Sequence, residues 1–130
     1  MITAKQLKET QKRTLQQLAK AKIVLTNEEK RHIEVADFGL NELKTIGLEL
    51  VVYVNTKRCC AKELVLFPYQ ICPEHRHPPI EGEPGKEETF RCRQGIVYLY
   101  VTGTKSSKLH CKLPKARAKN FTVFHEVILR

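Results

Sequence analysis

A succession of short apolar runs, separated by turn residues, is the feature of this sequence that most restricts its fold. Each run is rich in β-branched or aromatic residues, and Gly, Pro or Asn follows it before the next begins. The runs cover residues 48–54, 63–67, 70–72, 88–92, 96–101 and 121–129. Strands of this kind, joined by turns and not by helices, are typical of a β-sandwich or barrel and not of alternating βαβ units. We therefore expect a mainly β fold.

The N-terminal part of the chain has a helical composition. Residues 4–21 place leucines among Lys, Gln and Glu without Gly or Pro, which predicts an amphipathic helix. Thr26 and Glu29 fit a capping box, so a short second helix is expected to begin there. A chain of 130 residues with 42% hydrophobic residues is large enough for one folded domain. We expect a helical segment at residues 1–35 and a β-barrel portion at residues 48–130.

The apolar runs and the cysteines both indicate the cellular compartment in which the protein is found. No run approaches the roughly eighteen apolar residues of a membrane span, and the N-terminus has no signal-peptide core, so a cytoplasmic protein is expected. The five cysteines are an odd number and include the adjacent Cys59 and Cys60. That pattern does not fit a secreted disulfide framework, and we expect reduced thiols.

The net charge of +9 reflects 23 basic and 14 acidic residues, and it is unevenly distributed. Residues 105–119 contain basic side chains and no acidic one: Lys105, Lys108, Lys112, Lys115, Arg117 and Lys119. Such a cluster can bind phosphates. No stacking aromatic residue is interleaved before Phe121, however, and no nucleic-acid motif surrounds the segment. We interpret it as a solvated loop and expect neither a nucleic acid nor a membrane as partner.

Three side chains near the middle of the sequence form the pattern of a metal site. His75 and His77 are separated by one residue, so on a β-strand both rings would project from the same face. Glu88 follows after a segment rich in Pro and Gly, which suits a loop that returns the carboxylate beside the imidazoles. Two imidazoles and a carboxylate form a facial ligand set for a divalent transition metal ion, with positions left open for water or substrate.

A different metal site uses cysteines. Cys72, His75, His77 and Cys92 would form a closed tetrahedral zinc site of the structural kind. This alternative leaves Glu88 without a role and has no thiolate-rich motif around it. We favour the set of His75, His77 and Glu88.

The same residues carry a resemblance to a known family. His-x-His, a later Glu and then Gly95 resemble the first metal motif of the cupin superfamily, with a longer loop before the Glu. Within cupins, residues 33–40, 47–56, 62–68 and 72–95 resemble the D-lyxose isomerase family, and the similarity extends over residues 30–130. It implies a cupin-type β-barrel (jelly roll) preceded by one or two helices. It also implies an aldose-ketose isomerase of carbohydrate metabolism, which interconverts D-lyxose and D-xylulose and often D-mannose and D-fructose.

The resemblance assigns a cofactor to the motif. It implies that His75, His77 and Glu88 bind Mn2+, with other divalent ions possible. Isomerisation moves a proton between C2 and C1 of the open-chain sugar through a cis-enediol, and a divalent ion stabilises the charge on its two oxygens. Mn2+ suits imidazole and carboxylate ligands in an open octahedral site.

Lys86 is the candidate catalytic residue. It lies two residues before Glu88, so on one strand the two side chains would face the same side. Its ammonium group would hold a sugar oxygen or move a proton. Arg91 is out of phase with Lys86 and Glu88 on such a strand, and neither it nor Arg93 is assigned a role.

The family pattern contains more than this sequence supplies. The resemblance implies a fourth ligand, a histidine of a second motif, and a second acid-base carboxylate, but the sequence ends at Arg130, where that hairpin would begin. His110 and His125 are not in such a context, and His125 is expected to pack or bond within a strand. We expect a barrel that is incomplete at its C-terminus, whose open edge favours a homodimer. Two functions remain open: a sugar isomerase, and a non-catalytic metal-binding cupin fragment with little or no activity.

Overall fold

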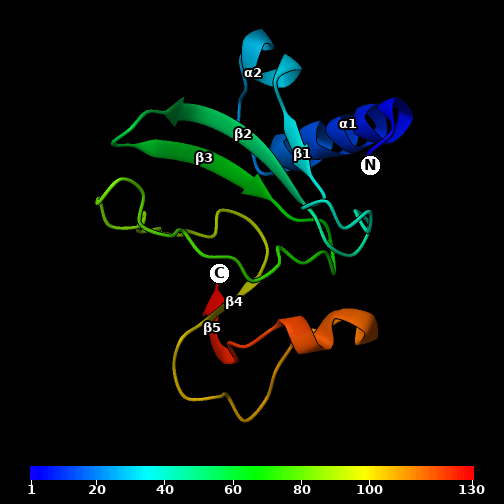
Figure 1. The fold of residues 1–130 in the computed structure, drawn as a ribbon. Helices are drawn as coiled ribbons and strands as arrows, with labels where there is room; N and C mark the ends of the chain where they lie inside the picture. The colour runs from blue at the N-terminus through cyan, green and yellow to red at the C-terminus, as the bar shows by residue number, and fades with distance from the viewer. The chain divides into compact units, whose positions relative to one another are not determined.

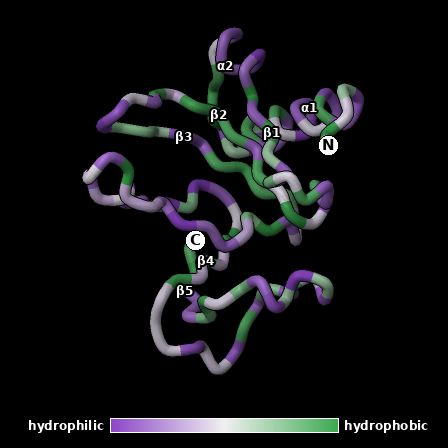
Figure 2. Tube along the Cα trace, in the orientation of Figure 1, coloured by the Kyte–Doolittle hydropathy of each residue, from purple (hydrophilic) through white to green (hydrophobic).

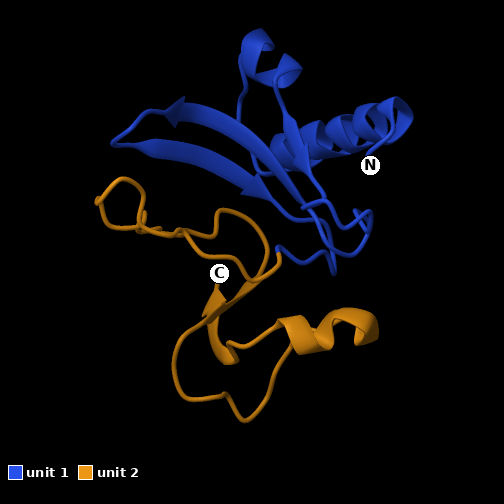
Figure 3. Cartoon of the chain, viewed as in Figure 1, with its two compact units in different colours: residues 1–72 blue, residues 73–130 orange.

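The computed structural model describes residues 1–130. The chain divides into two compact units, Met1–Cys72 and Pro73–Arg130, coloured blue and orange in Figure 3. Each unit is described here by itself. They contain one three-stranded and one two-stranded antiparallel sheet, two α-helices and a 3-10 helix. The expected β-rich fold with N-terminal helices is confirmed, and both sheets are open.

Two capped helices begin the first unit. Helix α1 spans Ala4–Lys20, and Thr3 closes its N-terminus with a capping box. Helix α2 spans Asn27–Arg31, where the Thr26 hydroxyl accepts from the Glu29 N–H at 3.1 Å and the Glu29 carboxylate accepts from the Thr26 N–H at 2.7 Å. A cap of this kind stabilises a helix by about 1 kcal/mol. Both expected helices are confirmed. Neither has the length and apolar character that spanning a bilayer requires.

The sheet of the first unit has the order β1-β2-β3 and is antiparallel throughout (Figure 1). Strand β1 spans Glu34–Ala36, β2 spans Leu48–Asn55 and β3 spans Cys60–Val65. A tight turn joins β2 to β3, in which the Thr56 N–H donates to the Cys59 carbonyl at 2.8 Å. The turn residues that follow residue 54 therefore end the strand, as the sequence predicts.

The hydrophobic core of this unit lies where α1 and the segment after it meet the sheet. Figure 2 shows β2 as a largely hydrophobic strand, and its Val51 is 1% exposed. Complete burial of one such side chain stabilises the fold by about 1.5–3 kcal/mol. The buried members are Leu18, Leu25, Ile33, Val51, Val65 and Phe67.

Glu49 of β2 brings a carboxyl group into this interior. The residue is 0% exposed, and its Oε1 accepts a hydrogen bond from Gln70 Nε2 at 3.2 Å, whereas the buried Oε2 has no partner. Burial raises the pKa of Glu49 to about 7, although the Gln70 bond and the charge of Arg13 lower it in part. The folded protein therefore keeps this carboxyl protonated at mildly acidic pH.

We expect the free energy of unfolding to fall as the pH rises from about 4.5 to about 7, because the unfolded chain releases the Glu49 proton first. The loss is complete above the folded pKa and is on the order of 3 kcal/mol. Glu49→Gln should remove this pH dependence while retaining the bond to Gln70. Urea unfolding followed by far-UV circular dichroism measures both proteins, with the exposed Glu34→Gln as control. Equal pH slopes for the parent and Glu49→Gln would contradict the assignment.

The second unit contains the two-stranded sheet. Strand β4 spans Val97–Val101 and pairs with β5, His125–Leu129, in an antiparallel register. The 3-10 helix η1, Lys115–Asn120, lies in the connection between them. The basic segment of residues 105–119 is thus only partly the loop that the sequence predicts, because its C-terminal end is helical.

Four expected strands differ from the structure. The strand expected at residues 63–67 is β3, which spans Cys60–Val65. Residues 70–72 contribute only an isolated bridge between Ile71 and Ile46, and residues 88–92 pair with no strand. Strand β5 begins at His125 and not at residue 121. Strand propensity describes how side chains fit a sheet, and without a neighbouring strand it does not produce one. Before β5, the N–H groups of Thr122 and Val123 donate to a side-chain carboxylate instead of a ladder.

Candidate metal centre

His75 and His77 lie in a segment that belongs to no strand, so the expectation that a strand presents both rings is wrong. Pro73, Pro78 and Pro79 lie on either side of them and have no N–H to donate to a ladder. The two rings nevertheless lie close together, with centroids 5.3 Å apart and planes at 88°. Local backbone geometry, and not strand alternation, brings the imidazoles to one place.

The loop that follows turns back at residues 80–83. Ile80 and Glu83 exchange two backbone hydrogen bonds, of 3.1 and 3.0 Å. Between them Glu81 has φ 52° and Gly82 has φ 81°, and positive φ at both central residues is the type I′ arrangement that reverses a chain tightly. The Pro- and Gly-rich loop therefore returns the chain toward the histidines, as its composition predicts.

Gly85 lets the returning arm of the loop approach the histidine arm. A Cβ built at Gly85 would lie 1.9 Å from the carbonyl oxygen of His77, so any other residue would force the two arms apart. Glu88 follows three residues later. The absence of a side chain at Gly85 thus helps to bring the carboxylate of Glu88 beside the ring of His77.

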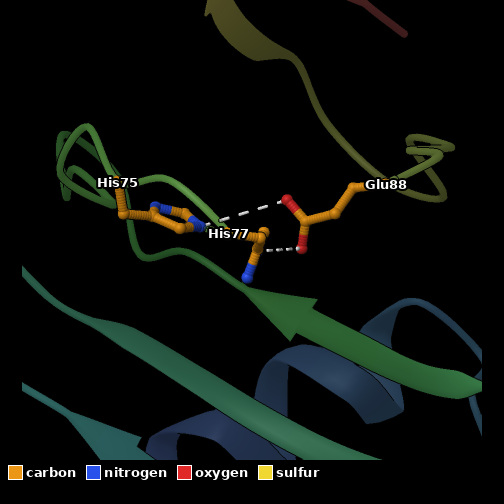
Figure 4. Close-up of side chains that lie close together, drawn as sticks. All are labelled: His75, His77 and Glu88. Atoms are coloured by element: carbon orange, nitrogen blue, oxygen red, sulfur yellow. Dashed lines mark ion pairs between the residues drawn. The ribbon is translucent and has the colours of Figure 1, made fainter. Parts of the chain in front are cut away.

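His75, His77 and Glu88 form one cluster (Figure 4). The Nε2 atom of His77 lies 3.2 Å from Glu88 Oε1, and the Nε2 atom of His75 lies 4.0 Å from Glu88 Oε2. One ligand atom from each side chain lies within 4.8 Å of the other two. The side chains are between 39% and 43% exposed, so solvent reaches the cluster.

The ring of His75 is oriented by its own backbone. Its Nδ1 lies 2.9 Å from the carbonyl oxygen of Pro73, which can only accept a hydrogen bond. This contact favours the tautomer with the proton on Nδ1, in which the lone pair lies on Nε2, the atom that faces Glu88. A carbonyl behind the ring that fixes the tautomer is typical of histidines that bind metals.

The three side chains fit a divalent transition metal ion. Bonds of about 2.1 Å to adjacent positions of an octahedron place the ligand atoms about 3 Å apart. The 3.2 Å between His77 Nε2 and Glu88 Oε1 already matches, whereas His75 Nε2 lies 4.0 Å from the other oxygen, Oε2, so its ring has to move closer by about 1 Å. Because the side chains are well exposed, small rotations suffice. Imidazole with carboxylate suits several divalent ions, Mn2+ among them.

The zinc alternative with two cysteines is not supported. Cys72 and Cys92 are not among the ligand-type side chains that gather here. The Sγ atom of Cys92 lies 3.6 and 3.5 Å from the carbonyl oxygens of Gln94 and Gly95, within its own turn. None of the five cysteines is in a disulfide bond.

Lys86 is exposed and lies in the returning arm, two residues before Glu88. The expectation that it shares a strand face with Glu88 is wrong, because residues 86–92 form no strand and the alternation of faces does not apply to them. The same holds for the expected phase of Arg91 relative to Lys86 and Glu88. Lys86 remains a candidate through its position in the sequence, two residues before Glu88.

Sequence reasoning missed Glu74, which directly precedes His75. Its carboxylate accepts hydrogen bonds from the N–H and the hydroxyl of Thr122, both at 2.6 Å, and from the N–H of Val123 at 3.3 Å. Nothing in the local sequence marks this residue, because its partners lie far along the chain. Only the folded unit brings them together.

A second polar cluster surrounds Glu126 in β5 and contains His110. The carboxylate accepts from the Tyr100 hydroxyl and from the backbone N–H and Nδ1 of His110, the latter two at 2.8 and 2.6 Å. The ring of His110 stacks on Tyr98 with centroids 4.6 Å apart. Burial, which raises the pKa of Glu126, is outweighed by these hydrogen bonds, and its pKa falls to about 2. The ring of His110 is thus paired with this carboxylate.

His125 is engaged elsewhere as well. Its Nδ1 lies 2.9 Å from the carbonyl oxygen of Thr104, and the residue begins β5. His125 thus lies in a strand, as expected, but its ring bonds to a residue outside any strand and not within one. Neither His110 nor His125 belongs to the cluster of His75, His77 and Glu88.

Comparison with curated proteins gives matches along the whole chain, whereas no protein-family model matches it. The D-lyxose/D-mannose isomerase of Thermosediminibacter oceani is 58% identical over 129 residues, which are 99% of this chain and 71% of that protein. A D-lyxose ketol-isomerase of a Thermofilum species is 55% identical over 130 residues, 100% of this chain and 72% of the relative. The D-lyxose ketol-isomerase of Cohnella laeviribosi is 52% identical over 122 residues, 94% of this chain and 67% of the relative.

Proposed function

The chain belongs to the family of D-lyxose ketol-isomerases, and from that premise we propose that it interconverts D-lyxose and D-xylulose with a divalent cation held by His75, His77 and Glu88. It is an aldose-ketose isomerase. The observation that best supports this reaction is the sequence identity of 58%, over 99% of the chain, to a D-lyxose/D-mannose isomerase. Mn2+ is the ion we propose, because it accepts imidazole and carboxylate ligands at an open octahedral site.

The three proposed ligands already lie close together and are oriented for binding. His77 and Glu88 already lie at 3.2 Å, and His75 presents Nε2 with its proton held on the other nitrogen by Pro73. Three ligands on one side of a bound cation would leave its opposite coordination positions open to a sugar. A divalent cation, when bound, supplies Lewis-acid stabilisation for the negative charge that develops on the sugar oxygens O1 and O2.

We propose that Lys86 is the general acid-base residue of the reaction. The reaction removes a proton from C2 of the open-chain aldose and returns one to C1, so a group that accepts and donates is needed near these carbons. An ammonium group beside a carboxylate ligand and a sugar can also hold a hydroxyl oxygen. Lys86 is within two residues of Glu88 and exposed to solvent, so a sugar can reach it.

We further infer that the fold is of the cupin type. Two antiparallel sheets with short strands, preceded by helices, are elements from which a jelly-roll barrel is built. His-x-His followed by Glu on a returning loop is the metal motif expected of such a barrel. The inference rests on this motif and on the family, since both sheets are open.

The purified 130-residue chain, stripped with a chelator, is expected to convert D-lyxose to D-xylulose only after Mn2+ is added. Chromatography of the sugars measures the product, and Co2+, Mg2+ and Zn2+ compare the ions. D-Mannose and D-fructose form a second pair of substrates. Turnover that survives complete removal of metal would refute the metal site. A chain that retains Mn2+ but converts neither sugar would refute the proposed activity.

A further inference from the structure

Glu74 makes a contact that joins two distant parts of the second unit. The two oxygens of its carboxylate bind residues 122 and 123, which are 48 and 49 positions further along the chain. Oε2 accepts from the backbone N–H groups of Thr122 and Val123, at 2.6 and 3.3 Å, while Oε1 accepts from the Thr122 hydroxyl at 2.6 Å. We call this set of three hydrogen bonds the Glu74 clamp.

The hydrogen bonds of the Glu74 clamp have an ionised carboxylate as acceptor. Hydrogen bonds to an ionised carboxylate are shorter and roughly twice as strong as those between neutral groups. Here one carboxylate uses both oxygens, and its partners include two backbone N–H groups, whose positions are fixed by the chain. Residues 121–124 form no strand, so these N–H groups have no ladder partner and the clamp satisfies them instead.

The clamp acts next to a metal ligand. Glu74 lies between Pro73, whose carbonyl fixes the tautomer of His75, and His75 itself. The segment of residues 73–79 belongs to no strand, so no ladder holds its backbone in place. Where a ladder is missing, a long-range contact of this kind restricts the movement of the residue that bears it.

We propose that Glu74 is a positioning residue for the metal site, and that by binding Thr122 and Val123 it holds the backbone that presents His75. This inference rests on the proposed function, because it takes His75 as a metal ligand. Glu74 itself is not a ligand: its two oxygens are engaged by residues 122 and 123 and it is not part of the cluster of His75, His77 and Glu88. It acts on metal affinity by reducing the number of positions that His75 adopts before binding.

The experiment measures Mn2+ binding to the 130-residue chain by electron paramagnetic resonance of the free ion. Outer-shell partners that bond directly to a metal ligand typically change affinity by about 10–100-fold when mutated. Glu74 acts one step further away, through the backbone, so Glu74→Ala is expected to raise the Kd about 10-fold, the lower end of that range. Glu74→Gln keeps one acceptor oxygen and should have a smaller effect. Thr122→Val removes the hydroxyl but leaves the backbone N–H groups, and its effect should also be smaller than that of Glu74→Ala.

A double-mutant cycle separates positioning from a general loss of stability. If Glu74 and Thr122 act through one contact, Thr122→Val should have no further effect on Kd once Glu74 is alanine. Glu83→Gln is the matched control, because it neutralises an exposed carboxylate in the same loop. The free energy of unfolding of each metal-free variant, measured by urea, shows whether Kd changes without an equal loss of folding.

Three outcomes would overturn one of two statements. If His77→Ala loses Mn2+ while Glu74→Ala binds it as the parent does, the clamp has no positioning role and the metal site stands. Equal effects of Glu74→Ala and of the control Glu83→Gln on Kd would likewise exclude a positioning role for the clamp. If His77→Ala binds Mn2+ as the parent does, the proposed metal site itself is wrong.

Discussion

Replacing His77 with alanine is expected to weaken Mn2+ binding at least about 100-fold, since a lost ligand costs more than a lost outer-shell partner. His77 has the shorter of the two contacts to Glu88, 3.2 Å, and Gly85 allows the carboxylate arm to approach it. Only two ligands of the cluster would remain. Metal content after gel filtration and the Kd for Mn2+ measure the loss, and isomerisation should disappear with the metal.

The folded structure should survive this change. The side chain of His77 is 39% exposed, and surface substitutions away from special features usually change stability by no more than about 0.5 kcal/mol. His32→Ala, at an exposed histidine in the first unit, is the matched control and should bind Mn2+ as the parent does. Normal metal binding by His77→Ala would exclude the site. A large loss in both variants would point instead to nonspecific binding by surface histidines.

Features that depend on neighbours in sequence could be predicted. The Thr26 and Glu29 capping box and β2 lie where local composition places them, because caps and strand propensity act over a few residues. The cluster of His75, His77 and Glu88 could also be found from sequence, because a Pro- and Gly-rich loop between ligand-type residues favours a chain reversal. The sequence thus pointed to three side chains that the structure brings together, although the secondary structure assigned to them was wrong.

Features that depend on distant partners could not be predicted. Residues 88–92 have strand propensity but no neighbouring strand, and residues 121–124 give their N–H groups to Glu74. Both outcomes are decided by contacts that the local sequence does not contain. The buried state of Glu49 is of the same kind, because a Glu in an alternating strand is expected to be exposed until its neighbours are known. The clamp and the raised pKa are therefore findings of the structure alone.

Replacing Lys86 with alanine is expected to lower kcat about 10²–10⁴-fold, the usual contribution of a positioned acid-base group, while Mn2+ binding stays as in the parent. The prediction separates Lys86 from the ligands, whose loss removes the metal first. Lys86→Arg keeps a positive charge that can hold a hydroxyl oxygen, but the guanidinium group does not release its proton at neutral pH. If Lys86 transfers a proton, both variants should be slow. If it only holds the sugar, the arginine variant should recover much of the activity.

The two roles of Lys86 also differ in how the kinetic constants change. A lost proton carrier lowers kcat with little change in KM, whereas a lost hydroxyl contact that is equally strong in ground and transition states raises KM alone. Lys57→Ala, at an exposed lysine in the turn between β2 and β3, is the matched control and should leave both constants unchanged. Full turnover by Lys86→Ala would remove Lys86 from the mechanism without affecting the metal site. Because Lys86 shares its loop with Glu88, measuring Mn2+ affinity in the same preparation is what makes a fall in kcat attributable to Lys86.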